Sequence, residues 1–463
     1  MMREMSCARG KIHPSQNHAP HVKDVWRAFA YRAWTHRSLA LATFLILSAL
    51  IFPQTSRAQV DYIARFTLEK HKFMVGEPIF CDFVIKNTGA RAIAFRYRSP
   101  DRSLNLALEN EPHFRVTGSN HHNVADPAPH PCGGAKGSAV YGSVSLPPGQ
   151  THTERWLLNQ WASFSHPGQY DVRADRHLPL FNSEGGQPDF SSKPVAFAGA
   201  INELQLEVIS GTPAELHAAL DLYIRKLDTP APADIAEAVL VATNLPQPYF
   251  LDKLIAVAHA SVGEHRWDRT RALEALARLG TPEAWRAVAQ IALGKNSSGA
   301  SSGKPEATSP DEPFRAQAIL LLAEKGDPAY LPAILEIISG ASGDLHGDAL
   351  RALGFFHNAK ANEVLFENLR SKISTDRVNA VLGLKNLNAK EVVPALLDML
   401  KDPVNEVRQV ANFALQGLTR EHFELSPSAN LSESARVAQQ WHAWWQSHAE
   451  TFTPTPQLPC HDW

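Results

Sequence analysis

The sequence has few cysteines, little net charge and, after Phe52, no long apolar run. Four cysteines occur in 463 residues and none forms a CxxC pair, which removes the usual signature of zinc and dithiol redox sites. No segment after Phe52 is long and apolar enough to be expected to span a bilayer. The formal net charge is −2, and residues 59–463 carry 37 basic and 45 acidic side chains. Such a mildly acidic chain lacks the basic face that nucleic-acid binding requires.

Motifs of common enzymes are also missing. The chain contains no G-x-S-x-G and no H-E-x-x-H, and the glycine-rich stretch Gly294–Gly303 lacks the Lys-Ser/Thr ending of a phosphate loop. A catalytic site can still assemble from distant residues. We nevertheless expect a protein that is not an enzyme and that holds no cofactor.

One group of residues keeps a metal site open as an alternative. Imidazole and thiolate groups suit zinc or copper, and they gather in the irregular middle of the β-patterned region at His113, His121, His122, His130 and Cys132. Their spacing matches no recognised site, and the chain has 21 histidines in all. We therefore expect no metal.

An export signal is expected at the N-terminus. Arginines precede the apolar run Leu39–Phe52, and Ser56-Arg57-Ala58 places small residues where signal peptidase requires them. The 14 residues of the run span about 21 Å as a helix, less than the ~30 Å core of a bilayer. We predict a signal peptide at 1–58, cleaved after Ala58, and a periplasmic or secreted protein. An uncleaved signal would instead hold the protein at the membrane.

The pattern of residues 59–210 is typical of short strands and turns. Apolar residues alternate in Ile79–Ile85, and Pro147-Pro148-Gly149 is one of several turns that separate such runs. In Pro167–Arg173 a turn is followed by Tyr-x-Val, which resembles the corner of immunoglobulin-like domains, where the tyrosine hydroxyl bonds back to the backbone. The resemblance implies an immunoglobulin-like β-sandwich.

Cys81 shares a strand face with the apolar residues of Ile79–Ile85. In an oxidising compartment it could form a disulfide with Cys132. A buried thiol that packs as a small apolar residue is the alternative, and the sequence leaves both open.

Helical spacing replaces alternation after Pro213, and one pattern then returns at a fixed interval. Each unit has a polar or basic anchor, alanine three positions later, and in most units large apolar residues at seven and ten. The anchors after 269 are 31 residues apart, and the first interval of 46 contains a Ser/Gly/Pro-rich insert at 294–313. A fixed period is typical of stacked repeats. The anchors and their alanines are Arg269 and Ala272, Arg315 and Ala318, His346 and Ala349, Arg377 and Ala380, and Arg408 and Ala411.

The stretch Asp402–Ala411 (DPVNEVRQVA) is similar to the core of the HEAT-repeat family, in the short form also found in phycobilisome-lyase type proteins. The resemblance implies helix pairs stacked into an α-solenoid over 214–448, with clear units from about 265 to 420. Lyase chemistry does not follow from it. A helix at 435–448 carries several tryptophans, which we expect to cap the last repeat; a ligand platform is the alternative. Residues 449–463 are expected to form a loose tail.

Two roles are open for the repeated arginines Arg269, Arg315, Arg377 and Arg408. They could line a groove for an acidic partner, or they could form a ladder that ties adjacent units together. We favour the ladder, and because exposed ion pairs add little stability, setting the register is its more plausible use. The acidic residues close to them in the chain are Asp268, Asp311, Asp376 and Glu406.

The repeat and the signal together predict a non-enzymatic scaffold or adaptor in the bacterial cell envelope. It would bind an unidentified protein partner, and no nucleic acid, through the repeat surface. One alternative is an inhibitor or ligand-binding protein in which the sandwich recognises the ligand and the repeats are its scaffold. The second alternative is a metal-dependent envelope enzyme that uses the histidine-rich segment.

Overall fold

The computed structural model describes residues 61–98, 111–118, 123–127, 141–184, 187–260, 266–295 and 311–455. The chain divides into two compact units, Met1–Gln59 and Val60–Trp463, and every described residue belongs to the second. The predicted signal peptide, most of the insert at 294–313, and His121, His122, His130 and Cys132 therefore lie outside the described residues. Within the described ranges, no helix has the length and apolarity needed to cross a bilayer.

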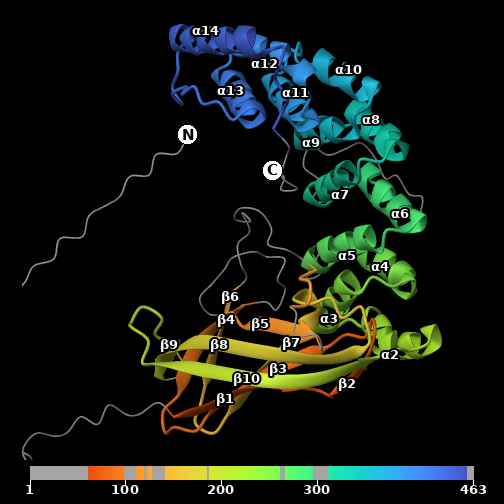
Figure 1. The fold of residues 1–463 in the computed structure, drawn as a ribbon, viewed down its shortest axis with the longest axis vertical. Coiled ribbons are helices and arrows are strands. Elements are labelled where there is room, and N and C mark those ends of the chain that lie inside the picture. The colour runs from red at the N-terminus through yellow and green to blue at the C-terminus, as the bar shows by residue number, and fades with distance from the viewer. Residues whose placement is uncertain are drawn as a thin grey trace, which may run out of the picture. The chain divides into compact units, whose positions relative to one another are not determined.

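The N-terminal region is β-rich and has two sheets (Figure 1). The first has the order β1-β3-β7, and the second has the order β2-β10-β8-β4-β6, with β5 and β9 also pairing with β8. Neighbouring strands run antiparallel, except that β10 and β2 are parallel. The bounds are β1 Tyr62–Leu68, β2 Lys72–Met74, β3 Phe80–Asn87, β4 Ile93–Arg98, β5 His113–Gly118, β6 Tyr141–Leu146, β7 Thr151–Leu157, β8 Gly168–Glu184, β9 Gln187–Pro188 and β10 Ala196–Ile209.

Alternation along the strands places one apolar face of each sheet in a common core. Phe66 and Phe83 come from the first sheet, and Phe95, Leu178 and Leu206 come from the second. All five are buried, because successive side chains of a strand point to opposite faces and only one face turns inward. The β-structure predicted for residues 59–210 is thus present.

The C-terminal region is helical from Pro213 to His448. Its first helix begins with a capping box, in which Thr212 and Glu215 bond each other's backbone N–H groups. Proline in the first turn starts several of the later helices. The bounds are α2 Pro213–Lys226, α3 Pro232–Asn244, α4 Leu251–Ala258, α5 Arg266–Leu279, α6 Pro282–Leu293, α7 Glu312–Lys325, α8 Leu331–Gly340, α9 Gly343–Leu353, α10 Ala359–Asn368, α11 Ser374–Leu387, α12 Val393–Met399, α13 Asn405–Thr419 and α14 Leu431–His448.

The helices that carry the anchors, α5, α7, α9, α11 and α13, pack against one another in succession. The intervening helices α4, α6, α8 and α10 lie on the other side of the stack (Figure 1). The alanine three positions after each anchor has an exposed fraction of 0%, because neighbouring helices approach closely there. The repeated alanine is therefore a packing position.

The β-rich and helical regions share part of their core. Phe80 and Leu157, at one end of β3 and β7, belong to the same buried cluster as Leu220 and Tyr223 of α2. Arg155 of β7 lies over the Phe80 ring, 4.2 Å from its centroid. Its guanidinium also lies 2.7 Å from Glu69 and 3.6 Å from Glu237 of α3. The strand ends thus cover the first helices of the stack.

The residues after α14 differ from the expected loose tail. Thr455 N donates to Leu418 O of α13, and Asn388 Nδ2, at the end of α11, donates to Thr455 O, both at 3.0 Å. The chain therefore runs back across the ends of two repeat helices as far as Thr455. The sequence has no periodicity here that would have indicated this contact.

Candidate functional site

Every repeated anchor contacts a main-chain carbonyl at or just after the C-terminal end of the helix before it. The last carbonyls of a helix lack partners and carry the negative end of its dipole, so a cationic N–H donor is favoured there. Arg269 Nε donates to Ala258 O (3.1 Å), Arg315 Nε to Ala292 O (3.0 Å), Arg377 Nη1 to Ser371 O (2.9 Å) and Arg408 Nη1 to Asp402 O (2.8 Å), and His346 Nδ1 lies 3.1 Å from Ile338 O.

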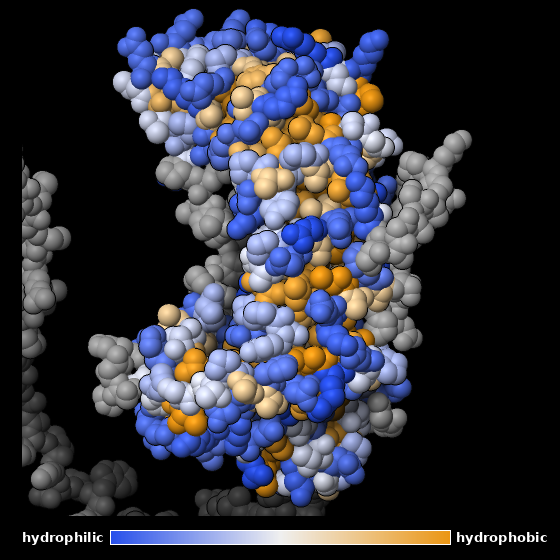
Figure 2. Space-filling model, turned by 90° about the vertical axis from the view of Figure 1, so that its right-hand side faces the viewer, coloured by the Kyte–Doolittle hydropathy of each residue, from blue (hydrophilic) through white to orange (hydrophobic). Residues whose placement is uncertain are grey.

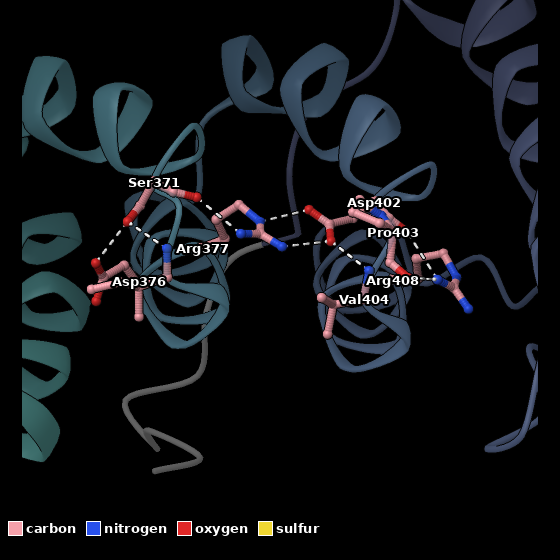
Figure 3. Close-up of polar contacts among 8 residues, drawn as sticks. Ser371, Asp376, Arg377, Asp402, Pro403, Val404 and Arg408 are labelled. Atoms are coloured by element: carbon pink, nitrogen blue, oxygen red, sulfur yellow. Dashed lines mark hydrogen bonds and ion pairs between the residues drawn. The ribbon is translucent and has the colours of Figure 1, made fainter.

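Three anchors also reach a carboxylate that belongs to the next unit. Arg269 Nη1 lies 2.8 Å from Asp311 Oδ1, and His346 Nε2 lies 3.7 Å from Asp376 Oδ1. Arg377 holds Asp402 with two parallel bonds, Nε to Oδ2 at 2.7 Å and Nη2 to Oδ1 at 2.8 Å (Figure 3). Each of these side chains therefore joins the end of one helix to the unit that follows.

The acidic partners differ from those nearest in the sequence. Asp376 is adjacent to Arg377 in the chain, but it accepts a hydrogen bond from Ser371 Oγ (Figure 3). Its carboxylate also lies near His346. The partner of Arg377 is Asp402, which lies 25 residues further on; Asp402 belongs to the HEAT-like motif of the sequence but was not predicted to be the partner of an anchor. The repeated DP pair could have indicated it, because Asp402 precedes Pro403 at the start of the next unit.

Asp402 connects two units through its carboxylate and its carbonyl. It is buried, and its Oδ1 also accepts the N–H of Val404 at 2.8 Å, ahead of α13. Burial raises the pKa of this carboxyl, but the hydrogen bonds from Arg377 and Val404 N outweigh burial, so the pKa lies below its ordinary value. Asp402 is therefore ionised at neutral pH and paired with Arg377.

Arg408 uses all of its donors inside the protein. Its side chain is 3% exposed, and a guanidinium has five N–H groups. The five acceptors are Ser434 Oγ (2.8 Å), Asp402 O (2.8 Å), Pro403 O (3.1 Å), Asn405 Oδ1 (3.1 Å) and Ala429 O (2.9 Å). No donor of Arg408 is left for a partner molecule, so this arginine joins α13, the segment after it and the start of α14.

Arg315 is the anchor with the fewest contacts among the described residues. Its guanidinium lies against Gly294, where an added Cβ would come within 3.1 Å of Cζ. Burial lowers its pKa more than Glu312 and Asp311 raise it. The adjoining residues 296–310 are outside the described part of the chain.

The other sequence-predicted sites have separate surroundings. Cys81 is a free, fully buried thiol, and burial raises its pKa to about 12, while its predicted disulfide partner Cys132 is outside the described residues. His113 lies exposed on β5, and the remaining residues of the histidine cluster are outside the description. Across the described ranges, no three His, Cys, Asp or Glu side chains come together as metal ligands.

The C-terminal tryptophans pack on the last repeat. Trp441 has an exposed fraction of 0%, donates from Nε1 to Asn412 Oδ1 at 2.7 Å, and meets Phe423 edge to face. Trp444 is half-buried and stacks on His448 with the ring centroids 4.7 Å apart. The buried indole of Trp441 acts as part of a cap on α13 and leaves no open aromatic platform at this position.

Residues 331–416 match the family model of HEAT repeats, and this range runs from α8 into α13. The helical region thus contains HEAT repeats. No curated protein matches the chain.

Solved structures are similar to parts of the chain at low identity. A β-glucosidase from Erythrobacter marinus is 11% identical over 32% of this chain and 16% of its own, with a TM-score of 0.16. An engineered protein is 16% identical over 49% of this chain and 93% of its own, with a TM-score of 0.25. Salmonella alpha-2-macroglobulin reacted with methylamine is 12% identical over 82% and 27%, with a TM-score of 0.19. The chain spans about a sixth of the β-glucosidase, and likenesses this weak do not inform function.

Proposed function

We propose that this protein is a non-enzymatic scaffold or adaptor that binds a protein partner through the surface of its HEAT repeats. The observation that carries the proposal is the match of residues 331–416 to HEAT repeats, which generally mediate protein–protein interaction. The anchors add support, because the guanidinium groups of Arg269, Arg377 and Arg408 form hydrogen bonds and ion pairs between units of the helical region. A partner would therefore meet the outer faces of the helices.

One such face is apolar along much of its length. Figure 2 shows the side of the stack formed by α6, α8 and α10, where orange side chains follow one another between hydrophilic margins. The apolar residues exposed or partly exposed on these helices are Leu293, Leu335, Ile338, Val364 and Phe366. Apolar surface gathered in one place is what interaction sites often present.

The finer description of the protein is part of the same proposal. The helical stack would be an α-solenoid, and the β-rich region would be an immunoglobulin-like sandwich that supports it. The hydroxyl of Tyr170 donates to His166 O at 2.7 Å, which is the backbone bond expected at the corner of such a domain. Export to the periplasm or beyond rests on the sequence of residues 1–58.

Photo-crosslinking in the producing cells would test the proposal in the intact chain. The photoreactive residue p-benzoylphenylalanine would replace exposed apolar residues of the helical region, Phe366 and Phe413, or of the β-rich region, Ile63 and Ile201. A reproducible protein adduct from the helical positions supports the scaffold. Adducts from the β positions alone would favour the inhibitor or ligand-binding alternative, and no adduct at any position would contradict the proposal.

The metal-dependent alternative has a separate test. Protein purified without a histidine tag would be analysed for bound zinc and copper by mass spectrometry. Stoichiometric metal would favour that alternative and would argue against the two expectations that the protein holds no cofactor and that it is not an enzyme.

A further inference from the structure

A groove of about 490 Å³ lies at the C-terminal end of the helical region. Its walls are α13, the segment that follows α13 and the start of α14. The volume falls in the range of about 300–1,000 Å³ that is usual for ligand sites. Lining residues used below are Gln409, Phe413 and Gln416 of α13, Glu424 of the segment, and Glu433 and Arg436 of α14.

Helix α13 already holds an extended chain beside this groove. Gln409 Nε2 donates to Ser426 O at 2.5 Å, and Asn412 Nδ2 and Gln416 Nε2 donate to Phe423 O at 2.9 and 3.1 Å. Three residues of extended chain and seven residues of helix each span about 10 Å. The segment therefore runs antiparallel to α13, and amide side chains hold it by its main-chain carbonyls.

Further hydrogen-bonding groups beside the groove have no partner among the described residues. These are the Oε1 atoms of Gln409 and Gln416 and the main-chain N–H and C=O of Glu424. Amide side chains and main-chain groups offer both donors and acceptors without net charge, which matches the backbone of a second extended chain.

Phe413 supplies an apolar contact in the same groove. Its side chain is 46% exposed, and Lys385 Nζ lies 5.1 Å from the ring centroid. The lining residues include two acidic side chains, Glu424 and Glu433, and one basic side chain, Arg436, and Lys385 lies over the Phe413 ring, so charges of both signs are close to balanced at the groove. Strongly acidic or strongly basic partners gain nothing from this arrangement.

We infer that this groove binds an extended, largely uncharged peptide segment of a partner protein. An apolar side chain of the peptide lies on Phe413, and its main chain bonds to Gln409, Gln416 and the edge of the segment at Glu424. The inference rests on the proposed function, because it names the site and the class of partner that the HEAT region would use.

Selection from a random peptide library would test the groove directly. The probe is a phage-displayed library of peptides about a dozen residues long, selected on the chain from residue 59 to residue 463. Enriched peptides would be synthesised with fluorescein and titrated by anisotropy against the wild-type chain, Phe413→Asp and Phe413→Leu. The matched control is Phe197→Asp on β10, an exposed phenylalanine that is not among the groove's lining residues.

We expect Phe413→Asp to weaken peptide binding at least about tenfold, since it removes the apolar contact and adds a desolvated charge. Phe413→Leu should retain most of the affinity, and Phe197→Asp should stay within about twofold of the wild type. Hydrogen exchange of α13 and α14 in each variant checks that the fold is unchanged.

Two results would overturn the inference. The first is that selection enriches no peptide, and the second is that the enriched peptides bind Phe413→Asp as tightly as the wild type. Both leave the proposed function standing if the crosslinker at Phe366 still captures a protein, and the proposed function fails separately if no helical position captures one.

Discussion

Replacing Arg408 with lysine should destabilise the end of the helical region although the positive charge is kept. Five oxygens around the guanidinium accept its five N–H groups, and the bonds to Ser434 Oγ, Asp402 O and Ala429 O are fully buried. The ammonium of lysine carries its donors on one nitrogen and cannot reach oxygens on different sides of a planar fork. Arg408→Lys therefore leaves buried acceptors without donors.

The expected loss follows from the number of buried bonds. An acceptor left unpaired in the interior costs about 1–3 kcal/mol. If lysine satisfies one of the three buried oxygens, the other two raise the free energy of the folded state by about 2–6 kcal/mol in all. The change is local, because the three acceptors belong to the connection between α12 and α13, the segment after α13 and the start of α14.

Hydrogen exchange measured by mass spectrometry gives the local free energy of opening for α13 and α14. Urea unfolding followed by tryptophan fluorescence adds a second readout, since Trp441 is buried against α13. The control is Arg436→Lys, an exposed position where a change within about 0.5 kcal/mol is expected. Equal opening free energies for Arg408→Lys and the wild type would refute the structural role assigned to Arg408.

Three further outcomes are expected. Asp402 has a pKa below its ordinary value, so its ionised form stabilises the fold above about pH 4. This stabilisation is lost as pH falls through the lowered folded-state pKa. The Tm difference between the wild type and Asp402→Asn should therefore be largest at neutral pH and shrink in acid. Arg155→Ala should increase hydrogen exchange in α2 and α3 and leave exchange in α13 unchanged, because Arg155 joins Glu69 to Glu237. Exchange in α2 and α3 equal to that of the wild type would contradict this. Cys81, with a pKa raised to about 12 by burial, should resist iodoacetamide at pH 8 in reduced native protein and react after unfolding, as read from its peptide by mass spectrometry.

The fixed period made the repeat anchors and their alanines predictable from the sequence. The partners of the anchors were not predictable, because they come from the next unit and depend on how tightly the helices stack. Arg377 meets Asp402 across 25 residues, and Arg269 meets Asp311 across 42. Proximity in the chain selected Asp376 and Asp268 instead, and only the packed helices show that Asp376 faces His346.

The packing contact between the β-rich and helical regions also could not be predicted from the sequence. Alternation places Phe80 and Leu157 on strands, but it does not say that their ends extend past the β core. The two side chains pack instead with Leu220 and Tyr223, since the chain turns from β10 into α2 within a few residues. A burial pattern of period two distinguishes the two faces of a strand and carries no information about which neighbour covers either face.

The chemistry of the anchor position explains why histidine can replace arginine in one unit. Every anchor contacts a carbonyl at a helix end, and three anchors also meet an acid of the next unit; the two ring nitrogens of His346 lie near Ile338 O and Asp376 in the same way. The positions that repeat in the sequence are thus those whose side chains contact the neighbouring units.

The groove residues of α13, in contrast, do not follow the repeat pattern. One period earlier, Gln409, Phe413 and Gln416 correspond to Val378, Leu382 and Lys385 of α11, a helix that packs on α13. After α13 the next element is an extended segment, and uncharged amides hold its carbonyls where a further repeat helix would have packed. At these positions the residue types differ from those one period earlier, although α13 packs on α11 as the other anchor helices pack on one another. We therefore expect selectivity for a partner there rather than at the arginine ladder.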